Sequence, residues 1–204
     1  WENGWFDWET FAVDVPQRRG DPVRIEKDEG VRPGTSAESL GNLRPVFAKD
    51  GSVTAGNAST LNDGASAVLI AEASFATSQG WEIIATIEDY CTSGVEPERV
   101  MSAPIPAVNT LLSRNGLEVL DVGVYEHNEA FASASCAVAQ EIGIPEDRFN
   151  LHGGAVSLGH PLGATGARIV GKAASLLQRE GGKYALATQC IGGGQGIATI
   201  LERI

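Results

Sequence analysis

The sequence has few residues of several kinds, and each scarcity excludes a class of protein. No apolar run approaches the roughly 18 residues that a membrane-spanning helix needs. Three cysteines, Cys91, Cys136 and Cys190, are too few and odd in number for a disulfide framework. Positive charge is also scarce, since 15 Lys and Arg stand against 26 Asp and Glu, for a net charge of −11. An acidic surface does not neutralise phosphates, so we expect neither nucleic acid nor a membrane as a partner.

The first residues lack the basic and then apolar pattern of a secretory leader. We therefore expect a cytoplasmic protein whose thiols are reduced. The chain starts at Trp1 rather than at Met, and we expect a trimmed chain or the second piece of a longer protein. At 204 residues it is long enough to bury a hydrophobic core.

Two regions differ in their sequence patterns. Residues 1–61 have little helical periodicity and many turn residues, which predicts a loop-rich region with short strands near 11–15 and 23–25. Beyond Gly64, apolar runs alternate with amphipathic stretches, which predicts an α/β fold. The expected strands of this second region are 65–70, 81–88, 119–125, 184–189 and 196–204, and its expected helices are 72–79, 104–115, 130–142 and 164–179.

Cys190 follows an expected strand and opens the run CIGGGQG. A lone cysteine is most often an inert core residue, because free Cys packs as a small hydrophobe. The three glycines favour a functional interpretation, since successive backbone N–H groups can hold an oxyanion beside the sulfur. Such a thiol acts only when it is partly deprotonated, so we expect its pKa to be lowered from the usual ~8.5.

His160 stands between a glycine and a proline in a glycine-rich stretch, and imidazole is well suited to move protons near neutral pH. We expect it to act in catalysis. Asn128 opens the motif NEAFA at a strand-to-helix junction, where asparagine either caps the helix or orients a water or a carbonyl. His127 and His152 are expected to be surface residues or supports for another side chain. Because no Cys or carboxylate stands at ligand spacing around the three histidines, we expect no metal site.

Four motifs occur along the chain: TAGNASTLNDGA (54–65), HNEAFA (127–132), GGAVSLGHPLGATGAR (153–168) and CIGGGQG (190–196). Together they closely resemble the C-terminal half of thiolases, which are the acetyl-CoA acetyltransferases and 3-ketoacyl-CoA thiolases. The resemblance implies an α/β thiolase fold with layers αβαβα, of which this chain would hold the second half and the end of the loop domain. Residues 1–61 would end the CoA-binding loop domain, and residues 62–204 would form the C-terminal thiolase domain.

The resemblance also implies a role for individual residues. His160 matches the histidine that activates the acylated cysteine, and Asn128 matches the residue that holds a water beside it. Cys190 matches the second catalytic cysteine, which exchanges the proton on the α-carbon of acetyl-CoA, and Gly192 matches a glycine whose N–H completes an oxyanion hole. Thiolases use coenzyme A and acyl-CoA as substrates and hold no permanent cofactor. Six positions match residues that line coenzyme A in the family: Arg32, Ser39, Ala55, Ser59, Ala130 and Phe131.

The cysteine that becomes acylated lies in the N-terminal half of thiolases, and Cys91 does not match it. The resemblance therefore predicts that an N-terminal half joins this chain, as a separate chain or a cleavage product, and that the assembled unit is a homodimer or tetramer. The predicted reaction is thiolytic cleavage of a 3-ketoacyl-CoA, or Claisen condensation of acetyl-CoA with an acyl-enzyme. Two alternatives stay open: a condensing relative without thiolysis, and a non-catalytic CoA-binding subunit that regulates a partner.

Overall fold

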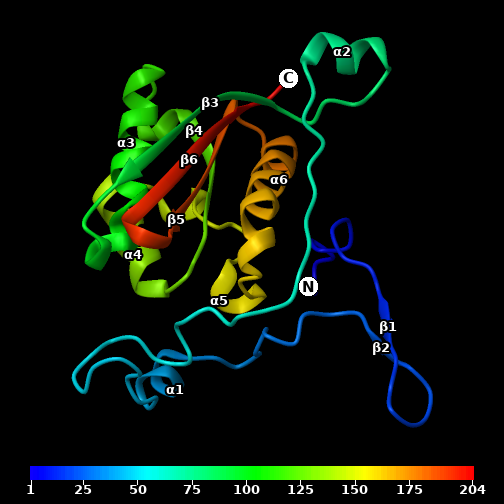
Figure 1. Ribbon diagram of the computed structural model, residues 1–204, viewed down its shortest axis with the longest axis vertical. Helices are drawn as coiled ribbons and strands as arrows, with labels where there is room; N and C mark the ends of the chain where they lie inside the picture. The colour runs from blue at the N-terminus through cyan, green and yellow to red at the C-terminus, as the bar shows by residue number, and fades with distance from the viewer.

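The computed structural model describes residues 1–204 (Figure 1). Its packed part is an α/β unit built around a four-stranded sheet of order β3-β6-β5-β4. The four strands are β3 (Thr86–Gly94), β4 (Val122–His127), β5 (Tyr184–Ile191) and β6 (Gln195–Glu202). Strands β4 and β5 are parallel, whereas β6 is antiparallel to both β5 and β3. It follows that β3, β4 and β5 point the same way, and that their carboxyl ends lie at one edge of the unit.

Helices cover both faces of this sheet (Figure 1). On one face, α3 (Pro104–Arg114) and α4 (Ala132–Ile142) pack into a core cluster with β4, β5 and β6. On the other face, α6 (Leu162–Glu180) contributes Ile169, Ala173, Leu176 and Leu177 to a second cluster. Their spacing places these four side chains on one side of the helix.

Shorter elements connect the strands and helices. The helical turn α5 (Ala155–Leu158) precedes α6. The remaining short elements are the 3-10 turns η1 (Pro97–Ser102), η2 (Val119–Asp121), η3 (Glu146–Arg148) and η4 (Gly192–Gly194). Two of them, η1 and η4, follow β3 and β5 at the carboxyl edge of the sheet, so they are placed to shape any site at that edge.

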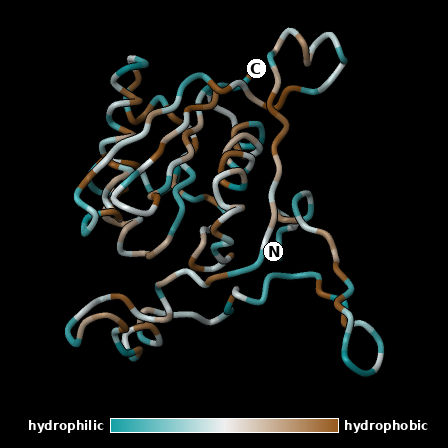
Figure 2. The backbone as a smooth tube through the Cα atoms, viewed as in Figure 1, coloured by the Kyte–Doolittle hydropathy of each residue, from teal (hydrophilic) through white to brown (hydrophobic).

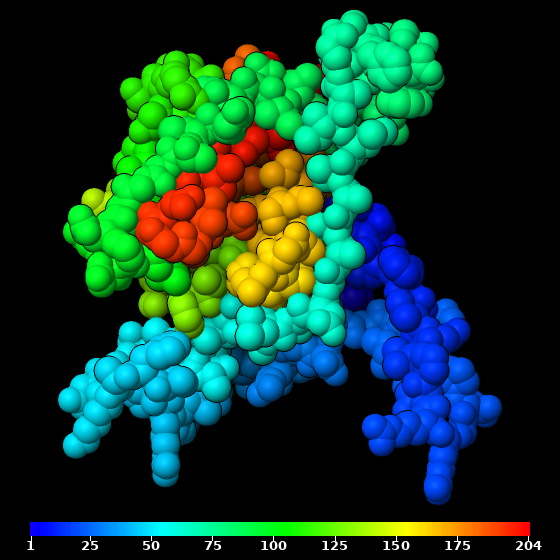
Figure 3. Space-filling view, in the orientation of Figure 1, coloured from blue at the N-terminus to red at the C-terminus, as the bar shows by residue number.

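The first 85 residues are mostly extended and lie outside the α/β unit. They form a hairpin of β1 (Val13–Val15) and β2 (Val23–Ile25), and two short helices, α1 (Ala37–Gly41) and α2 (Ala73–Ser78). The hairpin and the region around α1 project as separate arms in Figure 3. Near the chain start, the Nζ of Lys172 on α6 pairs with Glu9 and lies 4.7 Å from the ring centre of Phe6.

The structure confirms the expected α/β alternation and both short strands of the first region. One predicted strand is wrong, because residues 65–70 form no strand and are all exposed. Leu69 and Ile70 keep 80% and 69% of their surface exposed, and Figure 2 shows this apolar stretch running outside the α/β unit. No strand of this chain pairs with the segment. It runs beside α6 instead, where Ser66 Oγ donates to Ala164 O at 2.5 Å and a Cβ on Gly171 would lie 3.7 Å from Val68. Strand boundaries also differ: β3 begins at Thr86, and β4 begins only at Val122, after a 3-10 turn.

Candidate functional site

The carboxyl edge of the sheet gathers the residues on which the sequence analysis concentrated. The backbone N–H of Asn128, just beyond β4, donates to Thr188 O on β5 at 3.0 Å. Cys190 follows two residues later on β5. The side chain of Asn128 in turn lies 3.3 Å from His160 Nε2. Asn128, Cys190 and His160 therefore belong to one edge, although they are far apart in the sequence.

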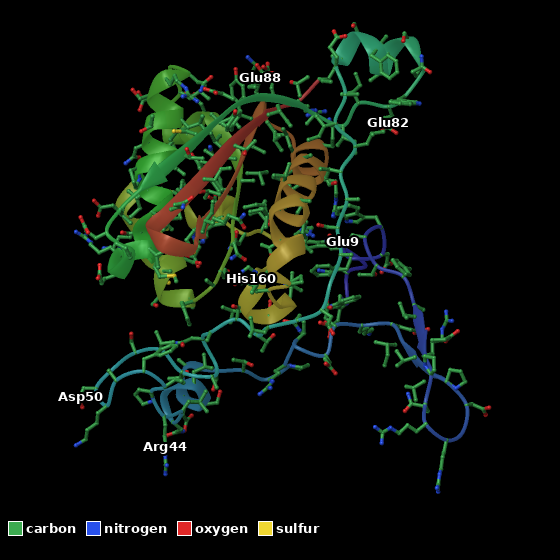
Figure 4. All side chains as sticks on the ribbon, viewed as in Figure 1. Glu9, Arg44, Asp50, Glu82, Glu88 and His160 are labelled. Atoms are coloured by element: carbon green, nitrogen blue, oxygen red, sulfur yellow. The ribbon has the colours of Figure 1, made fainter.

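A glycine turn delivers His160 to this edge, at the N-terminal end of α6 (Figure 4). Gly159 has φ +90°, and a Cβ there would collide with the amide of Asn62. That amide oxygen accepts the backbone N–H of His160 at 3.2 Å, and Thr60 O accepts it at 3.0 Å. The histidine backbone is thus clamped to the TAGNASTLND segment, and only glycine fits at the preceding position.

Hydrogen bonds select one tautomer of the His160 ring. Its Nδ1 lies 2.7 Å from Thr165 Oγ1, and that hydroxyl donates its own proton to Pro161 O at 3.0 Å. Thr165 Oγ1 can therefore only accept from the ring, which places the imidazole proton on Nδ1 and leaves Nε2 unprotonated. Asn128 Nδ2 donates to the Nε2 lone pair across 3.3 Å.

The surroundings keep His160 uncharged. Burial lowers its pKa below the usual 6.5, and the positive charge of Arg168 lowers it further. Near neutral pH the ring is consequently a base whose unprotonated nitrogen, Nε2, lies at the carboxyl edge. Asn128 itself is buried, and its Oδ1 has no hydrogen-bond partner in this chain. A buried carbonyl oxygen without a partner is a ready acceptor for a donor that enters the site.

Cys190 is the next-to-last residue of β5, and Ile191 alone separates it from the glycine turn η4. Gly193 and Gly194 have φ +77° and +87°, so this turn requires glycine at both positions. Gly192 is exposed, and a Cβ there would meet nothing within 4 Å. The expectation of a lowered thiol pKa is wrong, because burial raises the pKa of Cys190 above its usual value. At rest the side chain is a neutral thiol, which is a proton donor.

The loop after residue 54 docks on the start of α4 through its backbone. Ser59 N–H donates to Ala130 O at 3.1 Å, and Ala58 forms a bridge with Phe131. The ring of Phe131 meets that of Phe47 edge-on at 5.8 Å. Ser59, Ala130 and Phe131, three of the six positions matched to CoA contacts, therefore lie together beside the His160 turn.

The other three matched positions are less constrained. Ala55 is exposed on the same loop, and Arg32 is exposed on the extended arm before α1. Ser39 is exposed in the first turn of α1, where its hydroxyl completes a capping box with Ser36. Their neighbours approach the site loops: Gly30 lies against Ser157 O in the stretch before His160, and Leu40 lies against Gly56 on the loop that docks on α4.

Three supporting residues were missed in the sequence analysis. Thr165 orients the His160 ring. Asn150, with φ +46°, accepts the backbone N–H of His127 at 2.8 Å and donates to Glu129 at 2.9 Å. The second oxygen of Glu129 accepts Val156 N–H at 3.2 Å, so the carboxylate ties the end of β4 to the loop before His160. Asn150 had a sequence indication, since asparagine is the residue that most readily adopts left-handed backbone.

The other two histidines and Cys91 occupy supporting positions. His127 is fully buried, stacks on Phe149 and has its Nδ1 2.9 Å from Ser135 Oγ, while His152 stacks on Trp5. Burial lowers the pKa of both imidazoles to about 4, so both stay neutral. Cys91 lies within β3 opposite Ala198 and packs against the core.

A cavity of about 520 Å³ lies away from this site. Gly123, Gly181 and Gly182 line it together with Trp5 and His152. Since Gly123 begins β4 and the other two glycines precede β5, the cavity opens at the opposite edge of the sheet. It contains none of the predicted site residues.

Comparison with known proteins was made against families, sequences and structures. The family model described as "Thiolase, N-terminal domain" matches residues 1–74, and "Thiolase, C-terminal domain" matches residues 81–203. A probable acetyl-CoA acyltransferase of Staphylococcus epidermidis is 46% identical over 202 residues, which are 98% of this chain and 50% of the relative. An acetyl-CoA acetyltransferase of Chromobacterium violaceum is 46% identical over 200 residues, which are 98% of this chain and 51% of that protein.

The solved structures that match this chain are also thiolases. Human mitochondrial 3-ketoacyl-CoA thiolase matches with a TM-score of 0.93 and 41% identity, covering 100% of this chain and 51% of that one. A structure of the human enzyme in complex with CoA matches with a TM-score of 0.91, covering 100% of this chain and 50% of that one. The chain thus spans about half the length of the relatives it matches. No helix of the chain combines the length and the apolar character needed to cross a membrane.

Proposed function

We propose, since this chain belongs to the thiolase family, that it carries the proton-transferring half of a thiolase active site. An N-terminal half supplied from elsewhere would provide the cysteine that is acylated. The assembled unit would cleave a 3-ketoacyl-CoA with coenzyme A, or run the reverse condensation of acetyl-CoA with an acyl-enzyme. The observation that carries the proposal is the unprotonated Nε2 of His160, oriented by Thr165 at the edge where Cys190 lies near the end of β5.

His160 would act on the nucleophile of the missing half. Its neutral ring has a lone pair only at Nε2, so it takes the proton of a thiol placed there and leaves a thiolate. Asn128, whose Nδ2 faces that nitrogen, would keep the ring aligned and offer its unpaired Oδ1 to a water.

Cys190 would handle the proton of the α-carbon. In thiolysis the thiolate of the missing half attacks the 3-keto carbon, and the bond between the keto carbon and the α-carbon breaks. Its electron pair leaves as the enolate of acetyl-CoA, which takes the proton of the Cys190 thiol. The thiol of coenzyme A then gives its proton to the Cys190 thiolate and takes the acyl group, and the first cysteine leaves as a thiolate that the protonated His160 reprotonates. The neutral resting state of Cys190 supports this role, because an acid must hold its proton until the enolate forms.

The enolate and the tetrahedral intermediate both carry negative oxygen, which needs donors already in place. Gly192, exposed beside Cys190, would offer its N–H to one such oxygen. Losing one donor of an oxyanion hole costs ~10²–10³ in rate, so this glycine would matter as much as a side chain.

Coenzyme A would enter past the loop that docks on α4. Ser59, Ala130 and Phe131 would line the pantetheine arm with Ala55, since the first three already meet beside the His160 turn. Arg32 and Ser39, on the exposed arm around α1 that also carries Arg44 and Lys49, would lie near the adenine and its phosphates. We also propose that residues 1–61 end the CoA-binding loop domain and that residues 62–204 form the C-terminal domain.

The uncovered apolar surface supports the need for a second half. Val68, Leu69 and Ile70 are exposed on an extended segment that falls within the match to the N-terminal domain. The valines and isoleucine of the β1–β2 hairpin share one face, and it is uncovered as well. We propose that the missing half covers both surfaces, and that the assembled unit is itself a homodimer or tetramer.

The test is thiolysis of acetoacetyl-CoA by this chain produced together with an N-terminal half, such as the residues that precede the matched segment in the Staphylococcus epidermidis relative. We expect activity from the pair and none from this chain alone. Replacing Cys190 by Ala should abolish thiolysis yet leave acylation of the partner cysteine measurable by labelled acetyl-CoA. Replacing the exposed Cys136 by Ala is the matched control and should leave both intact.

If the assembled halves with Cys190→Ala could not be acylated although the partner cysteine is present, the proposal that Cys190 acts only on the α-carbon proton would be wrong. Thiolysis by this chain alone would contradict the need for a second half and would return Cys91 to consideration as the nucleophile.

A further inference from the structure

The side chain of Met101 lies directly beside the Cys190 thiol. The thiol Sγ donates a weak hydrogen bond to the thioether Sδ across 3.9 Å. Met101 comes from η1, the turn that follows β3, and both residues are partly buried. It is the single methionine of the chain. The two residues are 89 positions apart in the sequence, so no local pattern links them.

The backbone around Met101 has little freedom to move away. Val95 N–H donates to Gly194 O at 2.8 Å, and Ser93 Oγ donates to Ala103 O at 2.5 Å. A Cβ on Gly196 would come within 2.5 Å of the Ala103 carbonyl group. Hydrogen bonds therefore attach the two ends of η1 to β3 and to the turn after Cys190, and they fix the backbone position of Met101.

The chemistry of a thioether limits what Met101 can do there. It carries no charge and no proton, so it can neither deprotonate the thiol nor stabilise a thiolate. Its contribution is volume and the exclusion of water. That volume stands next to the sulfur that exchanges a proton with the α-carbon, and reacting atoms must come within about 3–3.5 Å. Any group attached to the α-carbon must therefore share space with Met101.

We propose that Met101 is a specificity-determining residue that selects 3-ketoacyl-CoA substrates with an unsubstituted α-carbon over those that carry a 2-methyl branch. This inference rests on the proposed function, because it takes Cys190 as the group that meets the α-carbon. The substrate class follows from position: a neighbour of Sγ restricts the α-carbon, whereas the far end of the acyl chain lies beyond its reach.

The test uses the assembled pair of halves and compares kcat/KM for 2-methylacetoacetyl-CoA with kcat/KM for acetoacetyl-CoA. The Met101→Ala variant should raise this ratio about tenfold, since one methyl group in an apolar pocket is worth 10–200-fold in discrimination. The Met101→Leu variant keeps the side-chain volume and should keep the wild-type ratio. An unchanged ratio in Met101→Ala would overturn the proposal.

A second readout does not depend on thiolysis and separates failure of this inference from failure of the proposed function. Cys190 in the assembled pair is alkylated with iodoacetamide and, separately, with the bulkier N-ethylmaleimide, and each site is followed by peptide mass spectrometry. Exposed Cys136 serves as the internal reference. Met101→Ala should raise the rate with N-ethylmaleimide relative to iodoacetamide at Cys190 only.

If no variant shows thiolysis, the proposed function fails and the alkylation ratio alone decides whether Met101 restricts access to the thiol. If thiolysis is present and neither ratio changes in Met101→Ala, the proposed function stands and the role of Met101 is wrong.

Discussion

The hydroxyl of Thr165, five residues along the same glycine-rich motif, decides which ring nitrogen of His160 carries the proton. Thr165 Oγ1 has a single proton and gives it to Pro161 O, so toward His160 it can only accept. This one choice places the ring proton on Nδ1 and the basic lone pair on Nε2. A threonine in the first turns of a helix commonly donates its hydroxyl proton to the carbonyl of a residue one turn earlier. Here that hydrogen bond also fixes the tautomer of His160.

Replacing Thr165 by Val should therefore lower kcat for thiolysis by about tenfold, because the ring loses the acceptor that orients it and one such hydrogen bond is worth about 1.4 kcal/mol. Thr165→Ser keeps Oγ and should stay within about twofold of the wild type. The measurement is steady-state thiolysis by the assembled halves. Equal activity of the Val and Ser variants would show that Thr165 only fills space.

The pH dependence of activity should report the neutral His160 ring. Burial and the charge of Arg168 both lower its pKa, so the base form persists below pH 6.5 and activity falls only when the pH drops through that lowered pKa. Removing the charge in Arg168→Gln should raise the His160 pKa and move the acid limb of kcat/KM to higher pH.

The exposed Arg203, beyond β6 at the opposite edge of the sheet, gives the matched control Arg203→Gln, which should leave the limb unchanged. If the acid limb of kcat/KM stayed in place in Arg168→Gln, or moved equally in both variants, the influence of Arg168 on the His160 pKa would be wrong.

At the scale of elements, the carboxyl edge is built from turns that only glycine can make. Gly159 before α6 and Gly193 and Gly194 after β5 all have positive φ. Each turn ends or begins an element at the position where a polar side chain must face the site. The left-handed backbone of these glycines orients the neighbouring side chains toward the site. Glycine loses more conformational entropy on folding than other residues, and the packing of the sheet offsets that cost.

Replacing Gly159 by Ala should be strongly destabilising or inactivating, since the new Cβ meets both an unfavourable φ of +90° and the Asn62 amide. Gly163, four residues later in the first turn of α6, has open space around it, so Gly163→Ala should stabilise by about 0.8–1.0 kcal/mol. Thermal unfolding and thiolysis of the assembled halves compare the two. Similar behaviour of both variants would contradict the role of the Gly159 turn.

At the scale of the whole molecule, the chain consists of a packed unit and a long, uncovered N-terminal region. The α/β unit buries its two core clusters, whereas the β1–β2 hairpin and residues 65–70 leave apolar side chains in solvent. Exposed apolar surface beyond a few hundred Å² marks an interface in most proteins. Residues 1–74 match the N-terminal thiolase domain, and we propose that the rest of such a domain covers this surface.

Replacing Leu69 by Asp should therefore abolish co-purification of this chain with a tagged N-terminal half, because a charge on the 65–70 segment cannot be buried without a partner. Leu120 is also exposed, at 65%, but lies in η2 at the other edge of the sheet, and Leu120→Asp should leave the pair intact. Retention of the complex by Leu69→Asp would place the interface elsewhere.

The sequence by itself determined the elements whose causes are local. Proline at the start of α3 and glycine at φ +81° after α4 were sufficient to place those helix ends within a residue or two. Its motifs also named His160, Asn128 and Cys190, because glycine, proline and cap residues around a reactive side chain are visible in a short window. For the same reason it placed both strands of the hairpin.

Tertiary structure alone decided whatever depends on a distant neighbour. The apolar residues 65–70 predict a strand, yet a strand exists only where another strand offers its backbone, and none in this chain does. The pKa of Cys190 rises rather than falls because packing buries the thiol, and Met101 reaches it across 89 positions. Burial and non-local contact are properties of the folded arrangement, so no local pattern could have predicted either one.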